Sequence, residues 1–208
     1  MGKRIGEFGL LFIGVFAATF LLSRVNSLIE GPRVALEPRV NAAVRLILEA
    51  PDEHIEMPFR TVRVSEISDS WHEPRSGRRK HEGQDIFAPV GTPIYSATNG
   101  IVVQKARTPK GGNVVSVLGA GGRVYYYAHL DRFVEGLEVT DAVTTETLVG
   151  YVGTTGNAVG TPAHLHFGVY DYGGAMNPLP LLMNRSQVAV PHGRLRAEVR
   201  VEHTLYPH

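Results

Sequence analysis

Residues 111–130 read GGNVVSVLGAGGRVYYYAHL, and this stretch indicates how the chain folds. Two runs rich in valine and tyrosine, 114–118 and 124–127, flank the glycine-rich segment 119–122. Valine and tyrosine fit the pleated, half-buried surface of a sheet, and glycines suit a tight turn between strands. The stretch therefore predicts two short strands joined by a turn, with His129 at the end of the second strand.

The same pattern of short strands and turns recurs on both sides of this stretch. Further strand candidates are residues 61–64, 93–97, 101–103, 148–152 and 164–170. Asn99-Gly100, between two of them, is a dipeptide typical of hairpin turns. Short strands with few helical stretches predict an all-β domain of packed antiparallel sheets at about residues 59–182.

Composition limits the class of protein. A chain of 208 residues with 43% apolar residues suits one main domain with extensions. The formal net charge of +1 gives no reason to expect nucleic acid as a partner. The sequence contains no cysteine, which excludes a thiolate metal site, a disulfide framework and a cysteine nucleophile.

The N-terminus predicts export. Lys3 and Arg4 precede the uncharged apolar run 8–22, which fits a signal sequence or a short signal anchor. Bulky residues stand where a cleavage site would need small ones, so an uncleaved anchor at residues 1–29 is favoured over a cleaved signal. The positive end would stay in the cytoplasm, and the β domain would lie outside the inner membrane, in the periplasm or cell-wall space.

The segments on either side of the predicted domain are short. Residues 30–58 are interpreted as a stalk, in which 40–48 has the apolar spacing of a short amphipathic helix. Residues 183–208 form a C-terminal extension with one strand candidate, 195–201, to which the sequence assigns no role.

His164-Leu165-His166 predicts chemistry on the last strand of the domain. Residues i and i+2 of a strand point to the same face, so the two histidines would share a face while Leu165 and Phe167 pack in the core. Two imidazoles together would be desolvated at a cost unless a metal or substrate satisfies them. Further candidates lie upstream: His81, Asp85 and His129. Two imidazoles and one carboxylate form a known ligand set for catalytic zinc, with the fourth position open to water.

The segment His81-Glu82-Gly83-Gln84-Asp85 allows two interpretations. It begins like the helical His-Glu-x-x-His motif of zincin proteases, with Glu82 as the base. Gly83 and the following Ile-Phe-Ala-Pro argue against a helix, so we expect a loop that enters a strand, with Glu82 pointing elsewhere. In the plainest interpretation, Asp85 caps a turn, His81 lies on the surface and His129 is an ordinary hydrogen-bonded residue.

Taken together, these motifs resemble the lysostaphin/LytM-type zinc peptidases, which cut peptidoglycan peptides. The resemblance covers roughly residues 57–182. It is carried by His-x-x-x-Asp, the histidine after an aromatic strand, His-Leu-His-Phe, Ser70-Trp71, Pro74-Arg75, Arg78, residues 81–89, Gly91-Thr92-Pro93, residues 126–130, residues 150–157 and Pro178-Leu179-Pro180. Gly168 stands where relatives often carry glutamate, a difference that bears on groove shape.

The resemblance implies a fold and roles for five residues. The fold would be the lysostaphin-like duplicated hybrid motif, with an open groove whose floor carries one zinc ion. His81, Asp85 and His166 correspond to the zinc ligands. His129 and His164 correspond to two catalytic histidines that do not bind zinc; one would assist the attacking water and the other would bind the oxyanion, in an order the sequence leaves open.

The leading functional hypothesis is a membrane-anchored zinc endopeptidase that acts on the peptide cross-links of peptidoglycan. The alternative is a catalytically silent LytM-type regulator that binds and activates a separate wall amidase. Such regulators typically lose zinc ligands, whereas this chain retains all five expected residues. A peptidase of extracellular proteins would share the same site and differ only in its substrate. The oligomeric state is not indicated by the sequence.

Overall fold

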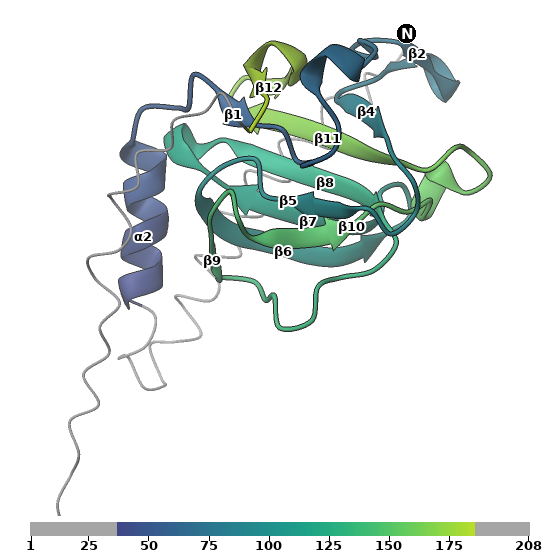
Figure 1. Cartoon of the computed structure of the whole chain (residues 1–208). Helices are drawn as coiled ribbons and strands as arrows, with labels where there is room; N and C mark the ends of the chain where they lie inside the picture. The colour runs from purple at the N-terminus through teal and green to yellow at the C-terminus, as the bar shows by residue number, and fades with distance from the viewer. Residues whose placement is uncertain (1–36, 186–208) are drawn as a thin grey trace, which may run out of the picture.

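One antiparallel sheet carries the fold in the computed structural model, which describes residues 37–185 (Figure 1). Six of the seven strands follow the order β12-β11-β8-β7-β6-β9. The seventh, β4, pairs with the first half of β11. The seven strands are β4 (Gln84–Phe87), β6 (Gly100–Thr108), β7 (Gly112–Leu118), β8 (Val124–Leu130), β9 (Ala142–Val143), β11 (His164–Asp171) and β12 (Gly174–Met176). The described part of the chain is therefore mostly β, as the sequence predicts.

Shorter elements surround this sheet. Strand pairs are formed by β1 (Ile55–Glu56) with β13 (Leu182–Met183), β2 (Pro74–Arg75) with β3 (Arg79–Lys80), and β5 (Pro93–Tyr95) with β10 (Leu148–Tyr151). The helices are α2 (Glu37–Leu48) and the 3-10 turns η1 (Val64–Glu66), η2 (Ser76–Arg78), η3 (Ala120–Gly122), η4 (Gly156–Ala158) and η5 (Leu179–Leu181).

The core lies on one face of the sheet and follows the alternation of the strands. Tyr125 and Tyr127 of β8, and Leu165 and Phe167 of β11, are fully buried. The rings of Tyr127 and Phe167 pack with their centroids 5.3 Å apart. The intervening residues of the two strands, among them His164 and His166 of β11, lie on the opposite face of the sheet.

The last residues of the segment interpreted as a stalk contribute to this core. Ile55 and Met57 are each at most 2% exposed and, together with Phe59 at the start of the predicted domain, belong to the main apolar cluster. Strand β1 pairs in parallel with β13, so Ile55 lies opposite Leu182. The two ends of the β domain are therefore joined by backbone hydrogen bonds.

Two predicted local features are wrong. Residues 61–64 do not form a strand, because polar side chains bind the backbone N–H groups there: Glu66 accepts from Arg63 and Asn184 accepts from Val64, each at 2.9 Å. Asn99-Gly100 does not close a hairpin, since β5 pairs with β10 and neither residue has the positive φ that a type I′ turn needs.

A short helix does occupy the segment for which one is predicted. Helix α2 packs against η3 near the edge of the domain, and Leu48 at its end is 80% exposed. Between residues 37 and 185, no helix is both long enough and apolar enough to cross a membrane. The predicted anchor, residues 1–29, and the strand candidate 195–201 lie outside the described residues.

Candidate metal centre

The pairing of β4 with β11 brings the first candidate residues together. In this antiparallel pair His166 lies opposite Asp85, and His164 lies opposite Phe87. Residues directly opposite each other share a face of the sheet. The side chains of His164 and His166 therefore face away from the core, while Leu165 and Phe167 are 0% exposed within it. This arrangement confirms the prediction for the His-Leu-His segment.

His81, Asp85 and His166 form a tight group, called here the His–Asp–His cluster. His81 Nε2 lies 2.8 Å from His166 Nδ1 and 3.0 Å from Asp85 Oδ1, and His166 Nδ1 lies 3.1 Å from the same Asp85 oxygen. Ligand atoms at about 2.0–2.1 Å around a tetrahedral zinc ion are about 3.3 Å from one another. The observed spacings are close to that value, so the cluster fits a single ion of this kind.

The charge state of the cluster also suits a cation. Burial by itself raises the pKa of Asp85, but hydrogen bonds with His166 and His81 outweigh it and hold that pKa well below its usual range. Burial lowers the pKa of His166, although the Asp85 carboxylate opposes this shift. A carboxylate beside neutral imidazoles is the protonation state in which these groups bind metal.

The backbone carbonyl of Ser70 determines which ring nitrogen of His81 faces the cluster. His81 Nδ1 lies 2.7 Å from the carbonyl oxygen of Ser70. A carbonyl can only accept, so Nδ1 carries the proton and Nε2 presents its lone pair to the cluster. His166 faces the cluster through Nδ1 instead. A Cβ on Gly83 would lie 2.6 Å from His166 Cε1, so the ring can take this position only beside a glycine.

Two residues that the sequence did not assign to the site hold Asp85. Arg75 Nη2 donates to Asp85 Oδ2 at 2.5 Å, which leaves Oδ1 for the cluster. The backbone N–H of Asp85 donates to Ser70 Oγ at 2.9 Å. Both residues lie in motifs that carry the family resemblance, which was the only available signal, because no spacing rule links them to a carboxylate.

His129 and His164, called here the histidine pair, border the cluster. Their ring centroids are 5.0 Å apart, and His164 Nε2 lies 3.8 Å from Asp85 Oδ1. His129 Nδ1 donates to the carbonyl of Thr155 at 2.9 Å, and His164 Nδ1 donates to that of Pro162 at 2.8 Å. Each Nδ1 is therefore occupied, and each Nε2 is free to meet a substrate.

A β-bulge places His129 on the same face as the cluster. Ala128 lies opposite His166, on the site face, so regular alternation would turn His129 toward the core. Register shifts between Asn113 and Val115 of β7, so that Ala128 and His129 together lie opposite one residue. His129 has a left-handed φ of 64°, and Leu130 resumes the core positions.

The surroundings of His129 determine its charge. Its side chain is 7% exposed, and this burial, together with the neighbouring His166 and His164, lowers its pKa to about 4. The Thr155 carbonyl and the Asp85 carboxylate oppose the shift without cancelling it. His129 is therefore a neutral imidazole near pH 7, able to accept a proton at Nε2.

The helical alternative for residues 81–85 is wrong. Strand β4 begins at Gln84, and the Glu82 side chain is exposed. His72 is also apart from the cluster, since its ring stacks on Trp71 with centroids 4.4 Å apart. His54 is exposed, and His192, His203 and His208 lie outside the described residues.

Comparison with known proteins finds a family that matches the segment containing this site. The profile of Peptidase family M23 matches residues 79–178, a segment that contains all five candidate residues. The chain is 35% identical over 124 residues to the L-Ala–D-Glu endopeptidase of Bacillus subtilis, covering 54% of this chain and 38% of that protein. It is 31% identical over 115 residues to the peptidoglycan DD-endopeptidase ShyC of Vibrio cholerae, covering 55% of this chain and 26% of that protein.

A solved structure shows the same fold. The catalytic domain of lysostaphin from Staphylococcus simulans superposes with a TM-score of 0.50 at 25% sequence identity, covering 56% of this chain and 92% of that domain. The described sheet thus corresponds to nearly all of a known peptidase domain. By contrast, the chain spans well under half the length of the two curated relatives named above.

Proposed function

The chain belongs to peptidase family M23 through residues 79–178, and from this premise we propose that it is a zinc-dependent endopeptidase of bacterial peptidoglycan. It would hydrolyse peptide cross-links of the wall during cell-wall remodelling. The observation that carries the proposal is the His–Asp–His cluster with the histidine pair beside it. The relatives in Bacillus subtilis and Vibrio cholerae are both named as endopeptidases, and the second is named for peptidoglycan.

In the proposed site, His81 Nε2, Asp85 Oδ1 and His166 Nδ1 would hold one zinc ion per chain. A bound zinc ion polarises the scissile carbonyl and lowers the pKa of its water to about 7. Arg75 keeps the second oxygen of Asp85 occupied, so the carboxylate offers one oxygen only. Ser70 fixes the His81 tautomer through its carbonyl and the Asp85 backbone through its hydroxyl.

The histidine pair supplies proton transfer and oxyanion binding in this proposal. Both residues present Nε2, because their Nδ1 protons are held by the carbonyls of Thr155 and Pro162. Neutral His129 can take a proton from the attacking water, and a protonated Nε2 of His164 can donate to the developing oxyanion. If the two histidines exchanged these roles, the same Nε2 atoms would act. Kinetics of the His129 and His164 single variants would distinguish the two assignments.

We also propose that the chain works outside the cytoplasm, tethered by its N-terminus. The support is the basic flank and the apolar run within residues 1–29. A tether of this kind would keep the β domain at the inner membrane, facing the wall. A reporter fused after His208 is expected to be active only if it functions outside the cytoplasm, and cytoplasmic activity would contradict this part of the proposal.

Digestion of purified peptidoglycan by the zinc-loaded full chain tests the function, with the released fragments identified by mass spectrometry. The expected result is new peptide ends in cross-linked fragments, lost on chelation and recovered with zinc. Glu82→Ala serves as the matched control, because Glu82 is exposed and only three residues from Asp85. Intact cross-links, together with activation of a separate wall amidase, would instead support the regulator.

A further inference from the structure

The β-bulge that carries His129 is supported from outside its own strand. His129 has a φ of 64°, a conformation that a residue other than glycine keeps only where its surroundings over-determine it. Its backbone N–H donates to the carbonyl of Gly111 at 2.7 Å, and its Nδ1 donates to that of Thr155 at 2.9 Å. The orientation of the imidazole therefore depends on two segments outside β8, which are the turn before β7 and the loop after β10.

The side chain of Thr155 joins these segments. Its Oγ1 accepts from the backbone N–H of Asn113 at 3.0 Å and donates to the carbonyl of Leu130, the residue after His129, at 2.8 Å. An N–H can only donate and a carbonyl can only accept, so the hydroxyl group has a single orientation. One side chain thus connects β7, β8 and the loop whose carbonyl binds the imidazole.

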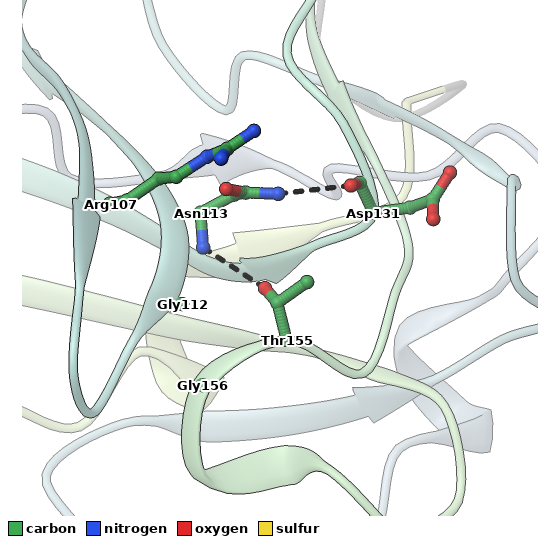
Figure 2. A pocket seen from close by; sticks show the side chains of 6 residues that line it. All are labelled: Arg107, Gly112, Asn113, Asp131, Thr155 and Gly156. Atoms are coloured by element: carbon green, nitrogen blue, oxygen red, sulfur yellow. Dashed lines mark hydrogen bonds between the residues drawn. The ribbon is translucent and has the colours of Figure 1, made fainter.

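Asn113 supports the same part of β8 from the core side of the sheet. It lies opposite Leu130, which packs in the core, and its own side chain is 7% exposed. Its Nδ2 donates to the carbonyls of Leu130 at 3.0 Å and Asp131 at 2.9 Å. Figure 2 shows the bonds from Asn113 to Thr155 and to Asp131. A buried amide therefore fixes the backbone directly after the bulge.

The loop also lies against the turn without a gap. A Cβ on Gly112 would lie 2.1 Å from Thr155 Oγ1, and a Cβ on Gly156 would lie 2.3 Å from the backbone nitrogen of Gly112. The backbone N–H of Asn157 donates to the carbonyl of Lys110 at 2.9 Å. Because the two backbones touch, the Thr155 carbonyl keeps a fixed place relative to the imidazole.

We propose that Thr155 and Asn113 are positioning residues for His129. The Thr155 carbonyl holds the Nδ1 proton, while the Thr155 hydroxyl and the Asn113 amide hold the bulge and the loop in the arrangement in which this contact forms. Nε2 then keeps its lone pair for the reaction. This inference rests on the proposed function, since it names residues through which a proposed catalytic histidine is prepared.

The first experiment observes the imidazole without any hydrolysis. The zinc-loaded full chain, labelled with nitrogen-15 histidine, is studied by nuclear magnetic resonance near pH 7, and His129→Asn identifies the His129 signals. In the wild type, Nδ1 of His129 should carry the proton. Thr155→Val keeps the shape of the side chain but removes both hydroxyl bonds, so signals of the Nε2–H tautomer should appear as well.

Two further variants complete this experiment. Thr155→Ser keeps the hydroxyl group and should retain the single tautomer. Asn113→Ala removes both amide bonds while Thr155 stays intact, and it should shift the tautomers in the same direction as Thr155→Val. A His129 tautomer that is unchanged in both Thr155→Val and Asn113→Ala would overturn the proposal.

The second experiment measures wall hydrolysis. Thr155→Val should lower kcat by about ten- to a hundredfold, because a displacement of about 1 Å can cost about a hundredfold in rate. Zinc content and KM should not change, and Thr155→Ser should restore kcat. Thr161→Val is the matched control, because the Thr161 hydroxyl bonds only within its own loop, to the Ala158 carbonyl at 2.8 Å and to the carbonyl of Pro162 at 3.4 Å.

A double variant separates positioning from general support of the fold. In a His129→Asn protein there is no imidazole to position, so adding Thr155→Val should lower kcat by no more than about twofold. A further tenfold fall in this background would show that Thr155 supports the site as a whole, and the proposal would be wrong.

The two readouts also separate this inference from the proposed function. If Thr155→Val changes the tautomer of His129 but neither this variant nor the wild type cuts wall peptides, the proposed function fails and the positioning role stands. If Thr155→Val cuts wall peptides as fast as the wild type, the positioning role fails and the function stands.

Discussion

The His–Asp–His cluster and the histidine pair lie on one face of the same sheet, but the atoms that they turn toward the site have different neighbours. In the cluster, three potential ligand atoms converge to within 3.1 Å of one another. In the pair, as for His81, a backbone carbonyl binds Nδ1 of each imidazole, but Nε2 forms no hydrogen bond with another described residue. The ligand atoms of the cluster thus converge on a shared centre, whereas each Nε2 of the pair is left open.

This difference is sharpest within β11, where two histidines are separated by one residue. His166 faces the site through Nδ1 and His164 through Nε2. For His164, the Pro162 carbonyl binds Nδ1, so Nε2 is the nitrogen left to face the site. In the proposed function, these two residues of the same type, two positions apart, would serve metal binding in one case and proton transfer in the other.

Removing a member of the cluster should have the largest effect. Asp85→Ala, His81→Ala and His166→Ala are each expected to lose stoichiometric zinc, because two remaining ligands do not replace the missing one. Wall hydrolysis should fall below detection. Metal content of the purified variants, measured by mass spectrometry, checks this, with Glu82→Ala expected to retain both zinc and activity. An Asp85→Ala protein that retained full zinc would show that Asp85 is not a ligand, and the contrast between the cluster and the pair would fail.

Removing a member of the histidine pair should spare zinc and reduce turnover. General acid–base help contributes typically about 10²–10⁴-fold to a rate, and an oxyanion donor about 10²–10³-fold. His164→Ala should therefore keep its metal while kcat falls by at least about a hundredfold. If His164→Ala lost zinc while His166→Ala retained it, the roles along β11 would be reversed.

The backbone at residue 129 needs its own control. His129 has a φ of 64°, which alanine adopts poorly and asparagine tolerates. His129→Asn should therefore fold like the wild type, retain zinc and lose at least about a hundredfold in kcat. A fall in thermal stability for His129→Ala but not for His129→Asn would identify strain as the cause of that loss.

The metal-free protein should become less stable as the pH falls from about 6.5 toward 4. The pKa of His129 is lowered to about 4 in the folded chain, so the unfolded chain takes up the proton first. Stability is then lost below the unfolded pKa, by up to about 3 kcal/mol when the pH has passed both values. Urea denaturation across this range checks the slope, and His129→Asn should reduce it. The slope should not vanish, because the pKa of His166 is lowered as well.

Removing a side chain that supports the cluster without belonging to it should have the smallest effect on zinc binding. Arg75→Gln leaves all three cluster residues in place but removes the ion pair to Asp85 Oδ2. Loss of an outer contact of this kind typically weakens metal binding about 10–100-fold, and about tenfold is expected here because the Arg75 side chain is 36% exposed. Zinc affinity measured by competition with a chelator tests this. Arg60→Gln should change nothing, and a tighter site in Arg75→Gln would refute the orienting role.

The sequence predicted those parts of the site that depend on short-range geometry. Alternation along a strand was enough to place His164 and His166 on one face and Leu165 in the core. Gly83 and the following segment 86–89 argued correctly against a helix at residues 81–85. The longest strands, β6, β7, β8 and β11, were also predicted, because their apolar runs are bounded by turn residues.

Other parts depend on contacts between distant segments and could not be predicted. Arg75 reaches Asp85 only after the β2–β3 hairpin has folded beside β4, and Thr155 reaches His129 from a loop 26 residues away. Residues 61–64 alternate like a strand, yet side chains as distant as Asn184 bind their backbone. The role of the bulge was also hidden, because a period of two assigns His129 to the wrong face.

Because of that bulge, deletion of a single residue could abolish catalysis in this chain while the fold is retained. Deleting the codon for Ala128 would restore regular alternation: Leu130 would still pack in the core, and the histidine would move back one residue, to the position opposite His166. One residue of strand is about 3.3 Å, enough to withdraw the imidazole from Thr155 and from any substrate. A single in-frame deletion could thus leave a folded domain with an intact His–Asp–His cluster and no turnover, the starting material for a protein that only binds.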